Sequence, residues 1–131
     1  MPNNTDVSYL LNISFLLFYV IRVGSPEPPA DCRVRLPDIA GSYQGECHRG
    51  KAHGHGRAVG RDIYEGEFAK GFPHGTGVYT WANGDVYKGE FVKGAKEGQG
   101  KMTFAAVADS VQQDSIQVGR WENDQFLGKE M

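Results

Sequence analysis

Apolar and polar residues alternate with a period of two through most of the chain after residue 42. Residues 64–68 read YEGEF, so the tyrosine, glycine and phenylalanine share one face of an extended segment while both glutamates share the other. Residues 74–81 alternate in the same way, and the stretch 69–71 between the two segments ends in a glycine suited to a turn. This pattern predicts a β-hairpin.

The hairpin pattern recurs along the chain. Its opening tyrosine stands at Tyr43, Tyr64 and Tyr87, 21 and 23 residues apart, and a weaker copy begins at Gln117. A fixed spacing of this size is a repeat-protein period. The turn signal Asn83-Gly84-Asp85 separates two successive hairpins. We therefore expect an all-β fold, an antiparallel meander of β-hairpin repeats in one sheet.

The boundaries of the units follow from the recurring tyrosine. The predicted repeat domain spans residues 43–131, with units 43–63, 64–86 and 87–116 and a degenerate cap at 117–128. The third unit is longer than the others, and the polar stretch from Ala108 to Ser115 predicts a loop that holds the extra residues.

The chain contains 18 glycines, about twice the usual share, and the fold gives them a purpose. A glycine on the aromatic face leaves a gap in which a ring from the neighbouring strand lies flat. Stacked hairpins are then expected to form an aromatic ladder that serves as the core. Its predicted members are Tyr43, Tyr64, Phe68, Tyr79, Trp81, Tyr87, Phe91, Phe104 and Trp121.

The first 25 residues differ from the repeats and predict a hydrophobic helix, either a signal peptide or a membrane anchor. Residues 9–23 are almost wholly apolar, and the small residues at 23–25 resemble a cleavage site. Against cleavage, no basic residue precedes this segment and all except Arg22 follow it, as in an anchor that keeps the repeats cytoplasmic. A mis-called start codon is a third explanation. A proline-containing linker at 26–42 follows, and we expect a protein that is exported (periplasmic or secreted) or membrane-anchored.

The segment YEGEFAKGFPHGTG from Tyr64 to Gly77 carries a resemblance to a known family. It is similar almost letter for letter to the membrane occupation and recognition nexus (MORN) repeat, Tyr-x-Gly-x-Phe-x-x-Gly-x-x-His-Gly-x-Gly. The resemblance is close from Tyr43 to Phe104 and weaker to Gly128. It implies an elongated, curved single sheet and a role as a scaffold, a dimerising segment or a membrane-associated module. The first unit, with its cysteine and hydrophobic start, also resembles small bacterial exported MORN-repeat proteins.

Charge and motif content argue against several function classes. The formal net charge is −2 and the pI is about 6.1, so there is no global basic field and we predict no nucleic-acid partner. No serine or cysteine nucleophile has an independent histidine and acid outside the repeat positions, and a one-layer sheet is not expected to form a deep pocket. The sequence therefore predicts a protein that is not an enzyme and that needs no cofactor.

The two cysteines are the candidates for a covalent link. Cys32 and Cys47 are fifteen residues apart, and an oxidising compartment would favour a disulfide between them, whereas in a cytosol Cys47 would remain a buried thiol. The only cluster with metal-ligand character is Cys47, His48, His53 and His55. Because His53 occupies a repeat position that His74 and Glu97 also fill, we predict no metal site.

A row of cations recurs at the hairpin turns. Arg49, Lys70 and Lys93 each precede a turn glycine, and this edge is the candidate surface for a partner or for anionic lipid. A second, acidic row comprises Glu46, Glu67 and Glu90, and we interpret it as a solvated strand face. The sequence thus predicts a scaffold module that binds an unidentified protein. A lipid-surface module and a self-assembling structural element are the alternatives.

Overall fold

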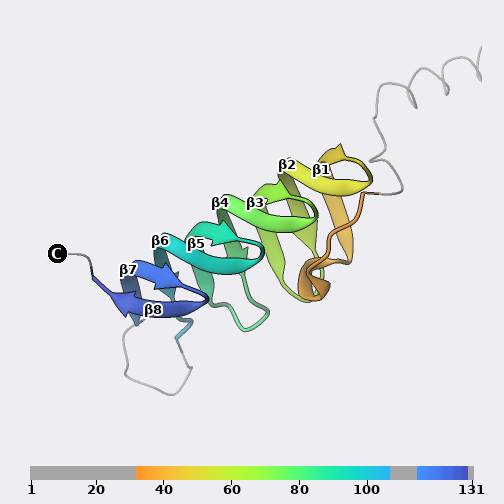
Figure 1. Cartoon of the computed structure of the whole chain (residues 1–131). Helices are drawn as coiled ribbons and strands as arrows, with labels where there is room; N and C mark the ends of the chain where they lie inside the picture. Colours follow the sequence, from red (N-terminus) through yellow and green to blue (C-terminus); the bar gives the residue numbers. More distant parts are fainter. Residues whose placement is uncertain (1–31, 107–114, 130–131) are drawn as a thin grey trace, which may run out of the picture.

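The computed structural model describes residues 32–106 and 115–129, and these form one eight-stranded antiparallel sheet (Figure 1). The strands are β1 (Ser42–His48), β2 (Lys51–Val59), β3 (Ile63–Ala69), β4 (Phe72–Thr80), β5 (Val86–Val92), β6 (Ala95–Thr103), β7 (Ile116–Glu122) and β8 (Gln125–Gly128). Each strand pairs with its neighbours in chain order, and the sheet is open. The predicted all-β meander is confirmed, and the hairpins stack in an elongated row.

Two predictions concern residues outside the described ones. The hydrophobic helix of residues 1–25 is one, and the loop at 108–115, apart from its last residue, is the other. The described residues contain one helical turn, the 3-10 helix η1 (Pro37–Ile39). Within residues 32–106 and 115–129, no helix is long and apolar enough to cross a membrane.

The second hairpin shows how a β-bulge interrupts the strand pairing within each repeat. Tyr64 pairs with Tyr79 and Gly66 with Gly77, after which the register shifts so that Phe68 pairs with Pro73. The single residue Glu67 therefore faces the three residues 74–76. This β-bulge bends the hairpin strongly, and the same shift occurs in the hairpins β1–β2 and β5–β6.

Glycines in register form a continuous stripe across seven strands. Its members are Gly45, Gly56, Gly66, Gly77, Gly89, Gly100 and Gly119. On the core side, the tyrosine of each complete unit lies against the glycine of its partner strand, as Tyr64 does against Gly77. A Cβ atom at Gly77 would overlap the hydroxyl and the ring of Tyr64. The glycine stripe therefore exists because the core rings occupy the space of its side chains.

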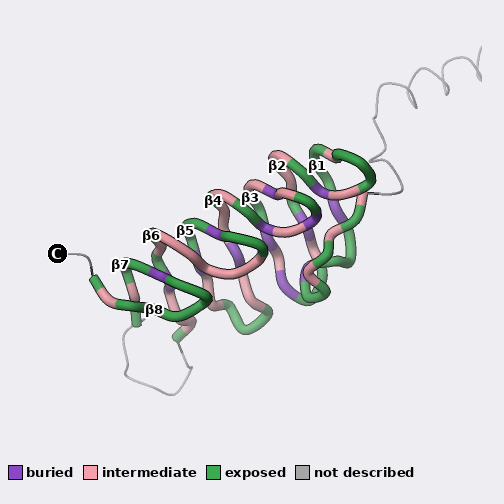
Figure 2. The backbone as a smooth tube through the Cα atoms, in the orientation of Figure 1, coloured by how far each residue is buried: buried purple, intermediate pink, exposed green. Residues whose placement is uncertain are grey.

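The aromatic side chains pack edge to face along the inside of the bend. The ring centroid of Tyr64 lies 5.0 Å from that of Phe68 and 5.1 Å from that of Phe91, and both pairs are T-shaped. The structure buries Tyr43, Tyr64, Phe68, Tyr79, Tyr87, Phe91 and Trp121, and it packs Trp81 and Phe104 against them. Buried residues recur from hairpin to hairpin (Figure 2), so the core is a thin rib shared by neighbouring units.

A segment before the repeats covers the first two hairpins. We call Cys32–Leu36 the strap. The Arg33 N–H donates to the Gly50 carbonyl (2.8 Å) and the Arg35 N–H donates to the Gly71 carbonyl (2.7 Å), while the Arg33 carbonyl accepts from the Ala52 N–H (2.8 Å). The alternate strap residues Cys32, Val34 and Leu36 pack against the aromatic core. The strap thus runs across the hairpin turns and closes part of the core from water.

The hairpin turns also bond to one another. The Gly71 N–H donates to the Ala52 carbonyl (2.9 Å) and the Gly94 N–H to the Pro73 carbonyl (2.8 Å). At the last hairpin the Asp124 N–H donates to the Lys96 carbonyl (3.1 Å). These bonds form a second ladder besides the strand pairing, and they align the turns along one edge of the molecule.

Candidate binding surface

The aligned turns present a row of cations that we call the basic turn edge. It comprises Arg49, Lys70 and Lys93 at the turns themselves, Lys51 beside the first turn, and Arg33 and Arg35 from the strap. The three turn residues and both strap arginines are exposed. Within the described part of the chain, none of these six side chains forms an ion pair with a carboxylate. Their charge is therefore available to a partner.

The turn cations stand in a backbone conformation that disfavours them. Arg49, Lys70 and Lys93 have φ angles of 50°, 52° and 48°, in the left-handed region. Two-residue hairpin turns of this kind prefer asparagine or aspartate before the glycine, because longer side chains pay a steric cost there. The fourth hairpin follows the preference for these residues, with Asn123 and Asp124 at its turn. Three successive cations at a costly position indicate that charge matters at this edge.

The basic turn edge ends at the fourth hairpin. The carboxylate of Asp124 accepts from the backbone N–H of Lys96 (2.8 Å). The carboxylate of Glu97 accepts from the backbone N–H of Asn123 (3.1 Å). Lys96 itself points inward, where its Nζ lies 5.1 Å from the ring centroid of Trp81 and 5.2 Å from that of Trp121. This lysine is a core component, so it adds no charge to the edge.

The acidic row has a structural role that the sequence analysis missed. The carboxylate of Glu67 accepts from the backbone N–H of Thr76 (2.5 Å) and from its hydroxyl (2.9 Å). Glu46 accepts in the same way from the His55 N–H (2.6 Å) and Glu90 from the Gln99 N–H (2.5 Å). Glu46 and Glu90 are exposed, as the interpretation as a solvated strand face implies, but each carboxylate of the row also satisfies an N–H at the β-bulge. The constant spacing of the glutamate from the opening tyrosine was the available signal.

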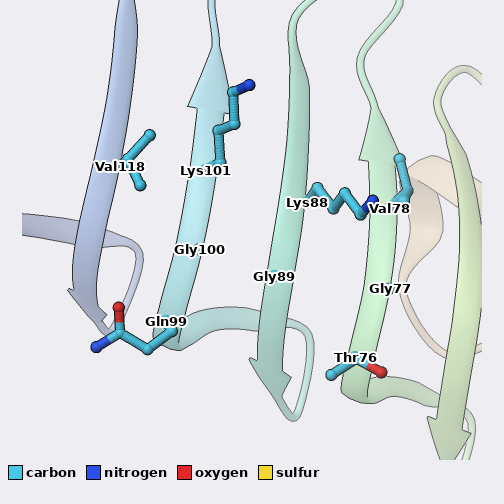
Figure 3. A pocket seen from close by; sticks show the side chains of 9 residues that line it. All are labelled: Thr76, Gly77, Val78, Lys88, Gly89, Gln99, Gly100, Lys101 and Val118. Carbon is cyan, nitrogen blue, oxygen red and sulfur yellow. The ribbon is translucent and has the colours of Figure 1, made fainter.

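The outer face of the sheet carries a shallow groove above the glycine stripe. A cavity of about 500 Å³ has Gly77, Gly89 and Gly100 as its floor (Figure 3). Lys88 and Lys101 are cross-strand neighbours on its rim. Because this face lacks large side chains over the glycines, an extended partner segment would find the backbone accessible here.

The two cysteines and the histidines of the candidate metal cluster lie on or next to the first hairpin. Cys32 and Cys47 form a disulfide with Cα atoms 5.7 Å apart, which joins the strap to β1. The ring centroids of His48 and His53 lie 5.3 Å apart with the rings tilted by 43°, near the first turn, whereas His55 lies beside Gln44 and Arg57. The structure thus separates the candidate metal cluster, and the described residues hold no group of three His, Cys, Asp or Glu side chains arranged for a metal ion.

The buried carboxylate of Asp62 has a structural role. Asp62 is 1% exposed and accepts from the Tyr79 hydroxyl (2.8 Å) and from the Ala82 N–H (3.0 Å). Burial opposes its ionisation, but the bonds from Arg61, Tyr79 and Ala82 together hold the pKa of Asp62 below its ordinary value. Arg61 also pairs with Asp38 (3.1 Å), which fixes the residues after the strap.

Taken together, the fold is that of an open hairpin-repeat protein with a thin aromatic core and with surfaces suited to binding. Residues 43–62, 64–86 and 87–106 each match the MORN repeat. Residues 43–106 therefore hold three consecutive MORN repeats, and repeats of this family are generally non-enzymatic modules that contact proteins or membranes. No curated protein matches the chain.

Three of the six residues of the basic turn edge could be predicted from the sequence. Arg49, Lys70 and Lys93 were predicted from their recurrence, and the structure places them at equivalent turns. Arg33 and Arg35 were not assigned to this edge because they precede the repeats. Their alternation with Cys32, Val34 and Leu36 was a signal for an extended strand with one apolar face.

Proposed function

We propose that this chain is a non-catalytic scaffold that binds an acidic surface of another protein through its basic turn edge. The observation that supports this most is the alignment of six cations without a carboxylate partner in the described residues. Electrostatic complementarity of this kind steers a partner and selects against basic surfaces. The rigid ladder of turn-to-turn bonds keeps the charges at fixed spacing, so the edge is pre-organised for one binding partner.

The disulfide supports a location outside the cytosol, because such bonds persist in oxidising compartments. We therefore propose an exported or membrane-tethered scaffold. The intact mass of the protein from fractionated native cells, measured with and without thiol alkylation, tests this part. Two cysteines protected from alkylation are expected. Two free thiols in a cytosolic fraction would contradict the proposed location.

A matched pair of exposed valines allows a test of the binding edge. Val92 is 42% exposed next to the third turn, and Val118 is 48% exposed on the outer face. A photoreactive residue at position 92 is expected to cross-link one discrete protein in native cells. The K70Q/K93Q double substitution should abolish this adduct. Adducts formed mainly from position 118 would instead assign binding to the outer face.

An anionic membrane is a second candidate for the same edge. Its support is the row of cations at successive turns, each worth about 1 kcal/mol near a charged leaflet. Flotation with phosphatidylserine vesicles is expected to show binding that falls steeply with salt, whereas phosphatidylcholine vesicles should bind weakly. Equal binding to both vesicle types would exclude this role of the edge.

A further inference from the structure

We propose that a pocket between the second and third turns is a binding site for a phosphate group. The pocket has a volume of about 390 Å³ and is lined by Arg35, Ala69, Lys70, Phe72, His74 and Lys93. This inference goes beyond the protein-binding function because its ligand is a small anion, although Arg35, Lys70 and Lys93 belong both to the pocket and to the basic turn edge.

The strap fixes the arginine of this pocket. The Arg35 backbone is held by its bond to the Gly71 carbonyl (2.7 Å), and its side-chain stem crosses directly over Gly71. The guanidinium carbon lies 4.8 Å from the ring centroid of Phe72. A guanidinium stacked on a ring keeps its N–H groups in its own plane, where they can form a fork on two oxygens of one anion.

Two lysines and a histidine complete the donor set. Lys70 and Lys93 start from equivalent positions of adjacent turns, and the bond from the Gly94 N–H to the Pro73 carbonyl (2.8 Å) fixes the third turn against the second hairpin. The Nδ1 atom of His74 accepts a hydrogen bond from the backbone N–H of Lys93 (3.4 Å). In the neutral histidine the hydrogen is then on Nε2, so the ring can also donate.

The composition of the pocket selects for phosphate among anions. Arg35, Lys70 and Lys93 bring three positive charges, and in the described structure no carboxylate pairs with them. A single carboxylate would leave much of this charge uncompensated, whereas a phosphate dianion presents three oxygens with a tetrahedral spread. Ala69 and Phe72 add apolar surface to the lining, which lowers the local polarity and strengthens the attraction.

A neighbouring pocket provides the comparison. The gap between the first and second turns has a volume of about 310 Å³ and is also basic, with Arg49, Lys51 and Lys70 in its lining. No arginine stacked on an aromatic ring lines that gap within the described chain. Arg49→Gln therefore removes one exposed charge from the same edge without touching the proposed site, and it is the matched control for Arg35→Gln.

The test is a titration of the isotope-labelled full chain with inorganic phosphate, followed by amide and arginine NMR signals at constant ionic strength. We expect saturable shifts confined to Arg35, Lys70, Gly71 and Lys93. R35Q should weaken binding about tenfold, and R49Q should change it less than about twofold. Shifts that do not saturate, or equal losses in R35Q and R49Q, would overturn the site in favour of diffuse attraction along the edge.

Vesicles distinguish the source of the phosphate group. Phosphatidylcholine vesicles with and without phosphatidic acid, which carries a phosphomonoester headgroup, are added to wild-type protein and to R35Q. If phosphatidic acid recruits the wild-type protein to the vesicles and R35Q abolishes this recruitment, the ligand is a lipid headgroup. Binding of inorganic phosphate without recruitment identifies a soluble phosphate. Recruitment that R35Q leaves unchanged would overturn the assignment of the pocket, while leaving the protein-binding proposal to the cross-linking test.

Discussion

Tyr64 lies with its ring against Gly77 of the adjoining strand, while its hydroxyl donates to the Glu67 carbonyl (2.8 Å). The glycine is thus a packing partner of the ring, and its lack of a side chain is required by the core. The same arrangement recurs with Tyr43 on Gly56 and with Tyr87 on Gly100.

Gly77→Ala is expected to destabilise the protein by about 1–3 kcal/mol, because the new methyl group displaces the Tyr64 ring from a packed core. Denaturant unfolding gives the free energy. Val78→Ala alters the next residue of the same strand, on the opposite face, and should cost no more than about 0.5 kcal/mol. Equal costs for the two substitutions would show that the ring does not depend on the glycine.

Lys93→Asn should stabilise the fold by roughly 0.5–1 kcal/mol, since asparagine tolerates the left-handed conformation that Lys93 adopts at φ 48°. The same change should weaken binding of inorganic phosphate, because it removes one cation of the pocket. Thermal unfolding and the phosphate titration measure the two effects. A variant that is both less stable and unchanged in binding would contradict a functional reason for lysine at this turn.

Cys32→Ser is expected to lower the free energy of unfolding by roughly 3 kcal/mol, the usual value for a loop of this length. Hydrogen exchange should show faster exchange at the Ala52 and Arg35 amides, because both bond across the strap interface. Reductant should destabilise the wild type by a similar amount and leave the variant unaffected. Unchanged exchange at these amides in the variant would mean that packing alone holds the strap.

The bonds from Thr76 to Glu67 make stability depend on pH. The backbone N–H of Thr76, and then its hydroxyl, hold the pKa of the Glu67 carboxyl below its ordinary value of 4.5. The stabilisation is therefore present above about pH 4.5 and is lost as the pH falls through the lower folded-state pKa. Glu67→Gln should remove this part of the acid dependence of the unfolding midpoint. An acid profile that is identical in the variant would rule out the carboxylate as its source.

The features of the fold that could be predicted from the sequence are those that recur within each repeat. Strand alternation and the aromatic core repeat locally, so both can be predicted from one unit such as 64–86. The strap is not periodic, and its place depends on contacts between Arg33 or Arg35 and turns far along the chain. The role of Glu67 was missed because the β-bulge appears only when two strands are placed in register.

The strap also makes the two ends of the array unequal. At its amino-terminal end, a non-repetitive segment is linked to β1 through Cys32–Cys47 and to the first two turns through backbone bonds. A duplicated unit inserted between the strap and β1 would separate these partners, whereas one added after β6 would disturb none of them. Gain and loss of units during evolution should therefore occur at the carboxyl-terminal side, where the degenerate last hairpin lies.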